Sequence, residues 1–199
     1  MFGTLLFWSY KKEFGYVITA FLLVLALPVV AVIILTKTGI SIVSDALIGI
    51  NPITRAIEIK NPVDGTVTAI ITKPVVWPAE GIITLEFGES SRYQLFHTGI
   101  DIANPYGVIG DPVFAFMEGK VIFVGESFIG YGKHVIIDHG NNLTSVYAHL
   151  DRVLVYPQQE IDVGRNIGLE GNTGWATGPH LHFETRVYGI PVNPRIFLE

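Results

Sequence analysis

The sequence contains no cysteine among its 199 residues. This absence excludes disulfide frameworks, thiol catalysis and every zinc site that needs thiolate ligands. Any metal must therefore be bound by His, Asp or Glu side chains. Because a chain without thiols is compatible with either side of a membrane, the absence does not determine the redox compartment.

Charged residues are also scarce. They make up 16% of the chain, and Lys+Arg 13 against Asp+Glu 18 gives a net charge of -5. No run of basic residues is present, which argues against DNA or RNA as a partner. Hydrophobic residues account for 49%, which is too much for a disordered chain and high for an ordinary soluble domain. Part of this apolar content therefore belongs in a membrane or in an unusually large core.

One long uncharged run, residues 17–36, lies near the N-terminus. At about 1.5 Å per residue, its helix would span roughly the 30 Å core of a lipid bilayer. We therefore predict a single transmembrane helix after a cytoplasmic segment, residues 1–16. Lys11 and Lys12 precede the run and Lys37 follows it, so the positive-inside bias favours a periplasmic or extracellular location for the rest of the chain. A cleaved signal peptide is the alternative, although its apolar region would normally be shorter.

The remaining sequence has the pattern of antiparallel β-structure. Strand-like alternation at 53–60 and 66–73, around the turn sequence 61–65 (NPVDG), predicts a β-hairpin in a juxtamembrane linker, residues 37–74. Further on, short apolar runs recur between Gly, Asn, Asp and Pro residues, and no comparable helical stretch is present. Residues 75–199 are therefore predicted to form a compact, mainly β domain of antiparallel sheet.

Metal chemistry must be sought among six histidines: His97, His134, His139, His149, His180 and His182. In a strand, His180 and His182 would point to the same face about 6.5 to 7 Å apart. One ring could then bind a metal while the other stands beside the open position of the metal. His97 and Asp101 could add a nitrogen and an oxygen ligand. Three such ligands and a water match an open tetrahedral zinc site.

Each of these patterns also has a structural interpretation. A His-x-His pair alone is often exposed or merely hydrogen-bonded, and His-x-x-x-Asp is a weaker signal still. His134 and His139 are expected to be structural or solvent-facing, and the role of His149 is ambiguous. Asp138 and Glu184 have no carboxylate partner at a useful spacing, so a glycosidase-like acid pair has no support, and no G-x-S-x-G element is present.

The order of the motifs is more specific than any of them alone. HTGIDIA is followed by GKVIFVG, GYGKHVIIDHG, SVYAHL, GNTGWATGPHLHFE and PVNP. This order resembles the lysostaphin-type (LytM-like) zinc metallopeptidases, which cut peptide bonds in bacterial peptidoglycan. The resemblance extends from about residue 77 to residue 194, and it implies a compact β-sheet domain with the site in a groove bordered by loops.

Carried over by motif, the resemblance implies that His97, Asp101 and His182 bind one Zn²⁺ per chain. It implies that His149 and His180 are catalytic histidines that do not bind the metal. All five positions hold the expected residue types. One departure lies before the first motif, where relatives commonly carry an arginine soon after a glycine that is here followed by Glu and Ser.

The function implied is that of a membrane-anchored zinc endopeptidase acting on the stem or cross-link peptides of peptidoglycan. Two alternatives remain. Some relatives have lost ligands and activate other cell-wall hydrolases, although the complete ligand set here argues against that role. The chain could also be a wall-binding component of an envelope-spanning machine or a phage particle. The bond cleaved, the protein partners and the identity of the general base are not determined by the sequence.

Overall fold

The computed structural model describes the backbone of residues 2–91 and 94–198. The side chains of residues 1–13, 15, 25 and 28–33 lie outside the described part. Contacts divide the chain into two compact units, residues 1–40 and residues 41–199. The second unit contains all of the predicted site residues.

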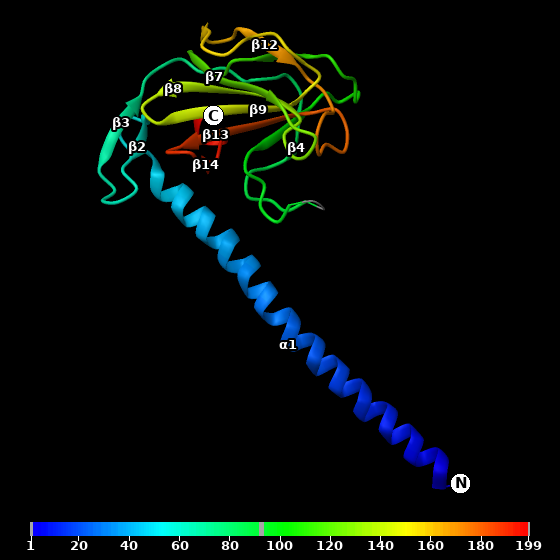
Figure 1. Cartoon of the computed structure of the whole chain (residues 1–199). Helices are drawn as coiled ribbons and strands as arrows, with labels where there is room; N and C mark the ends of the chain where they lie inside the picture. The colour runs from blue at the N-terminus through cyan, green and yellow to red at the C-terminus, as the bar shows by residue number, and fades with distance from the viewer. Residues whose placement is uncertain (1, 92–93, 199) are drawn as a thin grey trace. The chain divides into compact units, whose positions relative to one another are not determined.

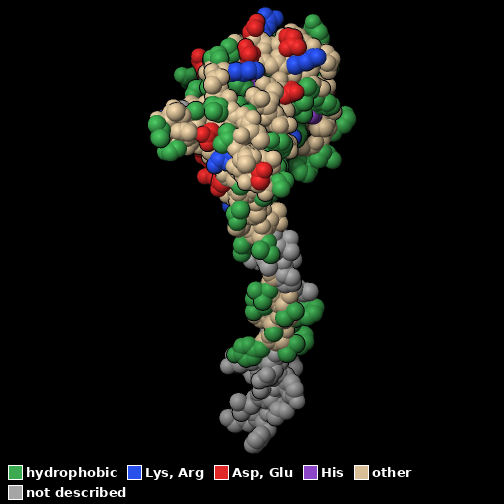
Figure 2. All heavy atoms as spheres, turned by 90° about the vertical axis from the view of Figure 1, so that its left-hand side faces the viewer, with side chains coloured by type: hydrophobic (Ala, Val, Ile, Leu, Met, Phe, Trp, Pro, Cys, Tyr) green, Lys and Arg blue, Asp and Glu red, His purple; other side chains and the backbone are tan. Residues whose placement is uncertain are grey.

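A single long helix, α1 (Phe2–Leu47), includes the predicted span 17–36. Figure 2 draws hydrophobic side chains in green, and the exposed apolar side chains of this span include Phe21 and Leu35. The rest of the span includes residues whose side chains are not described, 25 and 28–33. Over the described residues, no helix combines the length and the apolar character needed to cross a membrane.

The large sheet of the second unit has eight antiparallel strands. Seven follow the order β11-β7-β8-β9-β13-β5-β4, and β14 pairs with β13 (Figure 1). Their bounds are β4 (Ile82–Leu85), β5 (Ile100–Ala103), β7 (Gly119–Glu126), β8 (Lys133–Gly140), β9 (Leu143–Leu150), β11 (Glu160–Ile161), β13 (Leu181–Val187) and β14 (Ile190–Val192). The prediction of a compact, mainly β antiparallel domain is confirmed.

Two three-stranded sheets and a short helix complete the unit. One sheet has the order β1-β2-β3 and the other β10-β12-β6. Their bounds are β1 (Ile48–Ile50), β2 (Ile57–Lys60), β3 (Val67–Ile71), β6 (Pro112–Phe114), β10 (Arg152–Val153) and β12 (Asn166–Leu169), and the helix is α2 (Arg195–Leu198). The predicted hairpin is present as β2 and β3, and β1 joins it as a third strand that the sequence analysis did not predict.

The strand predicted over residues 53–60 begins later than expected, at Ile57. The reason is local, because the side-chain oxygen of Asn51 accepts hydrogen bonds of 3.0 Å from the backbone amides of Ile53 and Thr54. An Asn side chain that bonds the amides two and three residues on stabilises a turn in place of an extended strand.

All three sheets contribute to one hydrophobic core. Ile59 of β2 and Ile167 of β12 are fully buried in the same cluster as Phe183 of β13. Phe116 lies among these side chains, with its ring centroid 5.4 Å from that of Phe183 in an edge-on arrangement. Because Phe183 is next to His182 in β13, core packing on one side of this strand supports the candidate site on the other.

Candidate metal centre and its groove

Neighbouring strands of the large sheet bring the predicted ligands together. His182 of β13 lies opposite Asp101 of β5 and, on its other side, opposite Ala148 of β9. Side chains directly opposite each other in an antiparallel pair are close neighbours. His97 lies in the loop before β5, where its backbone amide donates a hydrogen bond of 2.8 Å to the carbonyl of Glu89. The sheet thereby brings His182 to His97 and Asp101, which lie 85 and 81 residues earlier in the sequence.

The three side chains meet through one atom each. His97 Nε2 is 2.9 Å from His182 Nδ1 and 2.9 Å from Asp101 Oδ1, and His182 Nδ1 is 2.8 Å from the same Asp101 oxygen. The side chains of His97 and His182 are 0% and 5% exposed, and that of Asp101 is 13% exposed. The structure therefore contains a compact, nearly buried group of two ring nitrogens and one carboxylate oxygen.

Hydrogen bonds at the outer ring nitrogens of His97 and His182 show whether the inner ring nitrogens carry a proton or a lone pair. His97 Nδ1 lies 3.1 Å from the backbone carbonyl of Glu86, and His182 Nε2 lies 3.0 Å from a carboxylate oxygen of Glu184. A carbonyl and an ionised carboxylate only accept, so both outer nitrogens donate and the inner nitrogens of neutral rings carry lone pairs. Together with Asp101, this places three acceptors in contact, an arrangement that needs either an added proton or a metal cation between them.

A zinc ion fits this donor set. Its protein ligands are nitrogen and oxygen atoms at about 2.0 to 2.2 Å, which in a tetrahedron places them roughly 3.3 Å from each other. The observed separations of 2.8 to 2.9 Å are close to that value. Three protein ligands leave the fourth position of a tetrahedron open, as in catalytic zinc sites.

Electrostatics at His182 also favour a positive charge. Burial would lower its pKa, but the hydrogen bonds and negative charges of Asp101 and Glu184 raise the pKa to about 9. A proton therefore occupies this ring at neutral pH when no metal is bound, and metal binding must displace it.

Two further histidines, His149 and His180, lie beside this group. Their ring centroids are 4.8 Å apart, and His180 Nε2 is 3.7 Å from Asp101 Oδ2. His149 Nδ1 lies 2.7 Å from the carbonyl of Thr173, and His180 Nδ1 lies 2.9 Å from the carbonyl of Gly178. Both Nδ1 atoms must donate to these carbonyls, so in the neutral rings each Nε2 has a free lone pair.

A bulge places His149 at the site. Between β8 and β9, the pair Lys133 and Leu150 is followed by the pair Val135 and Tyr147, so β9 has one extra residue in this interval. His149 lies within it and has a φ of 62°, a conformation that L-residues rarely adopt. Burial is the main cause that lowers the pKa of His149, to about 4, so this ring is neutral at neutral pH.

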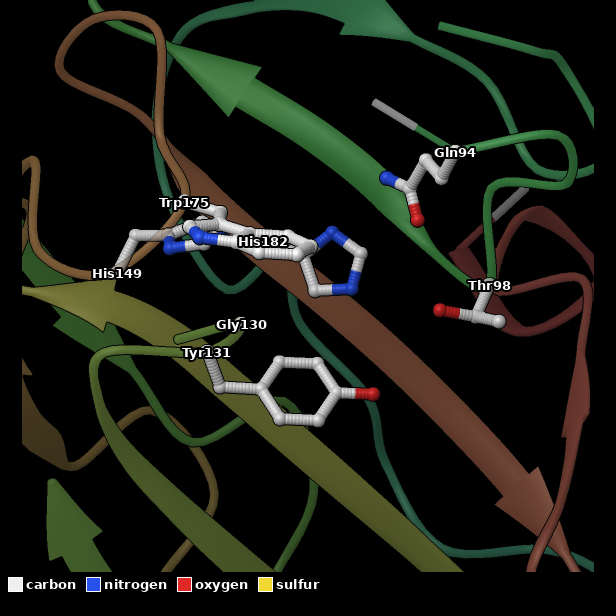
Figure 3. A pocket seen from close by; sticks show the side chains of 7 residues that line it. All are labelled: Gln94, Thr98, Gly130, Tyr131, His149, Trp175 and His182. Carbon is white, nitrogen blue, oxygen red and sulfur yellow. The ribbon is translucent and has the colours of Figure 1, made fainter. Parts of the chain in front are cut away.

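Four of the five side chains, those of Asp101, His149, His180 and His182, border a groove, and Figure 3 shows two of them, His149 and His182. One pocket is lined by residues from separate loops and strands: Gln94, Thr98, Gly130, Tyr131, His149, Trp175 and His182. Figure 3 shows Gln94 and Thr98 on the side opposite His149. A second pocket includes Asp101 and His180 as well as His149 and His182. Four of the five predicted site residues therefore line these two pockets, and the buried His97 joins the group through its contacts with Asp101 and His182.

Sequence reasoning missed Glu184, whose carboxylate is buried beside the ligands. Oε1 accepts hydrogen bonds from His182 Nε2 at 3.0 Å, from Tyr131 at 2.8 Å and from Thr98, and Oε2 accepts from Arg186 Nε at 2.7 Å. The signal that could have found this residue is strand periodicity. Every second side chain of a strand points to the same face, so His182, Glu184 and Arg186 share one face of β13.

The other two histidines lie elsewhere. His139 is 3% exposed, and its ring bonds the carbonyl of Glu118 and, at 2.7 Å, the hydroxyl of Ser145. His134 stacks on Phe123 with ring centroids 5.0 Å apart. Neither belongs to the group that could bind a metal among the described residues.

Comparison with known proteins agrees with this geometry. Residues 95–194 match Peptidase family M23. The chain belongs to this family. The resemblance to lysostaphin-type peptidases that the motif order predicted is thus confirmed. Peptidases of family M23 are zinc-dependent, and His97, Asp101 and His182 form a group that could hold a metal ion.

Three similar proteins illustrate the range of the family. The chain is 40% identical over 122 residues to the murein hydrolase activator NlpD of Escherichia coli (strain K12), covering 61% of this chain and 30% of NlpD. It is 44% identical over 97 residues to the peptidoglycan DD-endopeptidase ShyA of Vibrio cholerae, covering 49% of this chain and 22% of ShyA. The crystal structure of a zinc containing peptidase from Vibrio cholerae has 30% sequence identity and a TM-score of 0.58, covering 72% of this chain and 46% of that one. The chain thus spans less than a third of the length of these two sequence relatives.

Proposed function

We propose that this M23 chain is a zinc-dependent endopeptidase that hydrolyses peptide bonds in the stem or cross-link peptides of bacterial peptidoglycan. The observation that carries the proposal is the convergence of three inward-facing ligand atoms with two histidines that have free Nε2 atoms. The 44% identity to a peptidoglycan DD-endopeptidase supports the substrate class. An activator role alone would require neither the ligand group nor the adjacent histidines.

His97, Asp101 and His182 would hold the zinc ion. When bound, zinc polarises the scissile carbonyl and lowers the pKa of a coordinated water toward about 7. The protein has no H-E-x-x-H glutamate to act as base. Its own contribution therefore depends on the two histidines beside the ligands.

His149 and His180 would move the protons. With each Nδ1 bonded to a backbone carbonyl, each ring is fixed in the tautomer whose Nε2 accepts a proton. One Nε2 would take the proton of the attacking water. The other, once protonated, would stabilise the oxyanion or donate to the leaving amine.

Digestion of peptidoglycan with defined cross-links tests the proposal, with mass spectrometry to identify the fragments. The wild-type chain with zinc should release new amine and carboxyl ends at one type of peptide bond. His149→Ala and His180→Ala should retain zinc but lose about 10² to 10⁴-fold in rate. His134→Ala is the matched histidine control and should retain both properties. Stoichiometric loss of zinc from either of the first two variants would contradict the assigned roles.

The second candidate is an activator of other cell-wall hydrolases, which the 40% identity to a murein hydrolase activator favours. An activator should accelerate a separate peptidoglycan hydrolase added to the same substrate, and His182→Ala should preserve this effect. The endopeptidase function predicts the opposite pattern, because cleavage should occur without a second enzyme and should be lost in His182→Ala.

We also propose that residues 17–36 anchor the chain in the cytoplasmic membrane, with the N-terminus in the cytoplasm and the peptidase unit in the periplasm or outside the cell. The uncharged run of the sequence and the location of peptidoglycan support this topology. Asp162 is exposed, so Asp162→Cys in this cysteine-free chain provides a unique label site. It should react with a membrane-impermeant maleimide once any outer envelope is permeable. Labelling that needs lysis of the cytoplasmic membrane would place the unit inside.

A further inference from the structure

Glu184 has an unusual number of partners for one buried carboxylate. Its side chain is 0% exposed, and its oxygens accept from His182, Tyr131, Thr98 and Arg186. Arg186 approaches Oε2 with two nitrogens, Nε at 2.7 Å and Nη2 at 2.6 Å. Burying an ionised carboxylate is costly unless hydrogen bonds and an opposite charge compensate it, and here both do.

The hydrogen bond to His182 determines the direction of that ring. Glu184 Oε1 is 3.0 Å from Nε2, and an ionised carboxylate can only accept there. The proton of a neutral ring is therefore held on Nε2, which leaves the lone pair on Nδ1. Nδ1 is the atom that lies 2.9 Å from His97 Nε2 and 2.8 Å from Asp101 Oδ1. The opposite tautomer would direct an N–H at the position of a metal.

The remaining partners fix Glu184 itself. Tyr131 donates its only hydroxyl proton to Glu184 Oε1 at 2.8 Å and accepts from Arg186 Nη2 at 2.8 Å. Glu184, Tyr131 and Arg186 thus form a closed ring of hydrogen bonds. Burial, followed by the charge on Glu184, raises the pKa of Tyr131 to about 12, so its hydroxyl keeps the proton that it donates.

We propose that Glu184 is a positioning residue that fixes the ring and tautomer of His182 for metal binding, and that Tyr131 and Arg186 hold Glu184 in place. This inference rests on the proposed function, since it assigns His182 to a metal. Tyr131 also lines the groove in Figure 3, so the same network connects the groove to the ligand group.

Glu184→Gln tests the role of the carboxylate with little change in volume. Arg186 would draw the amide oxygen toward itself, so the amide NH₂ would face His182 Nε2 and favour the opposite tautomer. Zinc affinity, measured by competition with a chelator, should fall about 10 to 100-fold. In the zinc-free protein at high pH, ¹⁵N NMR should show the proton of His182 moved from Nε2 to Nδ1.

Glu170→Gln is the matched control. Glu170 is also 0% exposed, but its described hydrogen bond is with the backbone of Asn104 and not with a ligand. This variant should keep the zinc affinity and the His182 tautomer of the wild type. A general effect of replacing a buried glutamate by glutamine would change both variants alike and would overturn the proposal.

The outcomes separate this inference from the proposed function. If the wild type binds no zinc, the proposed function fails first. If the wild type binds zinc and Glu184→Gln binds it equally tightly with the proton still on Nε2, only the positioning role fails. Should Glu184→Gln not fold, Tyr131→Phe removes one donor to Glu184 and should weaken zinc binding by about threefold. Unchanged affinity in a folded Tyr131→Phe would then overturn the proposal.

Discussion

Replacing Gly99 by alanine should separate two strands that hold the ligand group. Gly99 directly precedes β5, and a Cβ at this position would lie 2.2 Å from the carbonyl oxygen of Phe183 in β13. A non-bonded carbon and oxygen normally stay about 3.3 Å apart. The backbone must therefore open by roughly 1 Å between Gly99, two residues before Asp101, and Phe183, which follows His182. A backbone carbonyl cannot rotate away as a flexible side chain could.

The expected loss of stability follows from two opposing effects. Overpacking of this kind costs about 1 to 3 kcal/mol. The replacement of Gly by Ala gains about 0.4 to 1 kcal/mol because it reduces the freedom of the unfolded chain. With mid-range values of about 2 and 0.7 kcal/mol, the net loss for Gly99→Ala is about 1.3 kcal/mol. For a domain of this size, Tm should fall by about 3 to 5 °C.

Gly178→Ala provides the matched control, since a Cβ at Gly178 would meet no atom within 4 Å. Gly178→Ala only reduces the conformational freedom of the unfolded chain, so the Tm of this variant should stay level or rise by a few degrees. Differential scanning calorimetry of both variants without metal measures the difference, and chelator competition should show weaker zinc binding only in Gly99→Ala. Equal Tm values in the two variants would refute the steric argument at Gly99.

Three further variants or conditions test other parts of the structure. Burial lowers the pKa of His139 to about 4 from an ordinary 6.5. As pH falls, this histidine is therefore protonated in the unfolded chain before it is protonated in the folded protein. About 3 kcal/mol of folding stability should be lost between pH 6.5 and pH 4. Urea unfolding across this range should show a smaller loss in His139→Gln. Burial raises the pKa of Glu170 to about 7 from 4.5, so stability should fall as pH rises through this window, and Glu170→Gln should flatten that slope in the same urea series. His182→Ala should lose most of one bound zinc per chain by elemental analysis, and unchanged zinc would remove His182 from the ligand set.

The general fold and the residue types of the site were accessible from the sequence. Alternating apolar and polar residues between turn signals predicted antiparallel strands, because side chains alternate between the two faces of a sheet. The same rule placed His180 and His182 on one side, and it would have added Glu184 had the pattern been followed two residues further. The order of the motifs then assigned the family, which the match over residues 95–194 confirms.

The contacts between distant segments required the tertiary structure. The pairing of His182 with Asp101 depends on the register between β13 and β5, which is set by long-range packing and not by the spacing of either motif. His149 faces the site only because a bulge gives it a φ of 62°, and no local pattern predicted that bulge.

The sequence by itself determined which chemical groups the protein could use. Without cysteine, only His, Asp and Glu were left as metal ligands, and the alternation along β13 placed His182 and Glu184 on one face. Only the tertiary structure decided which ring nitrogen of each histidine faces the metal position. That choice depends on the carbonyl of Glu86, which a separate turn brings to His97, and on the carboxylate of Glu184, which Tyr131 binds from a distant segment. Local residue preferences act over a few positions, whereas hydrogen bonds to a buried ring come from whichever segments pack around it.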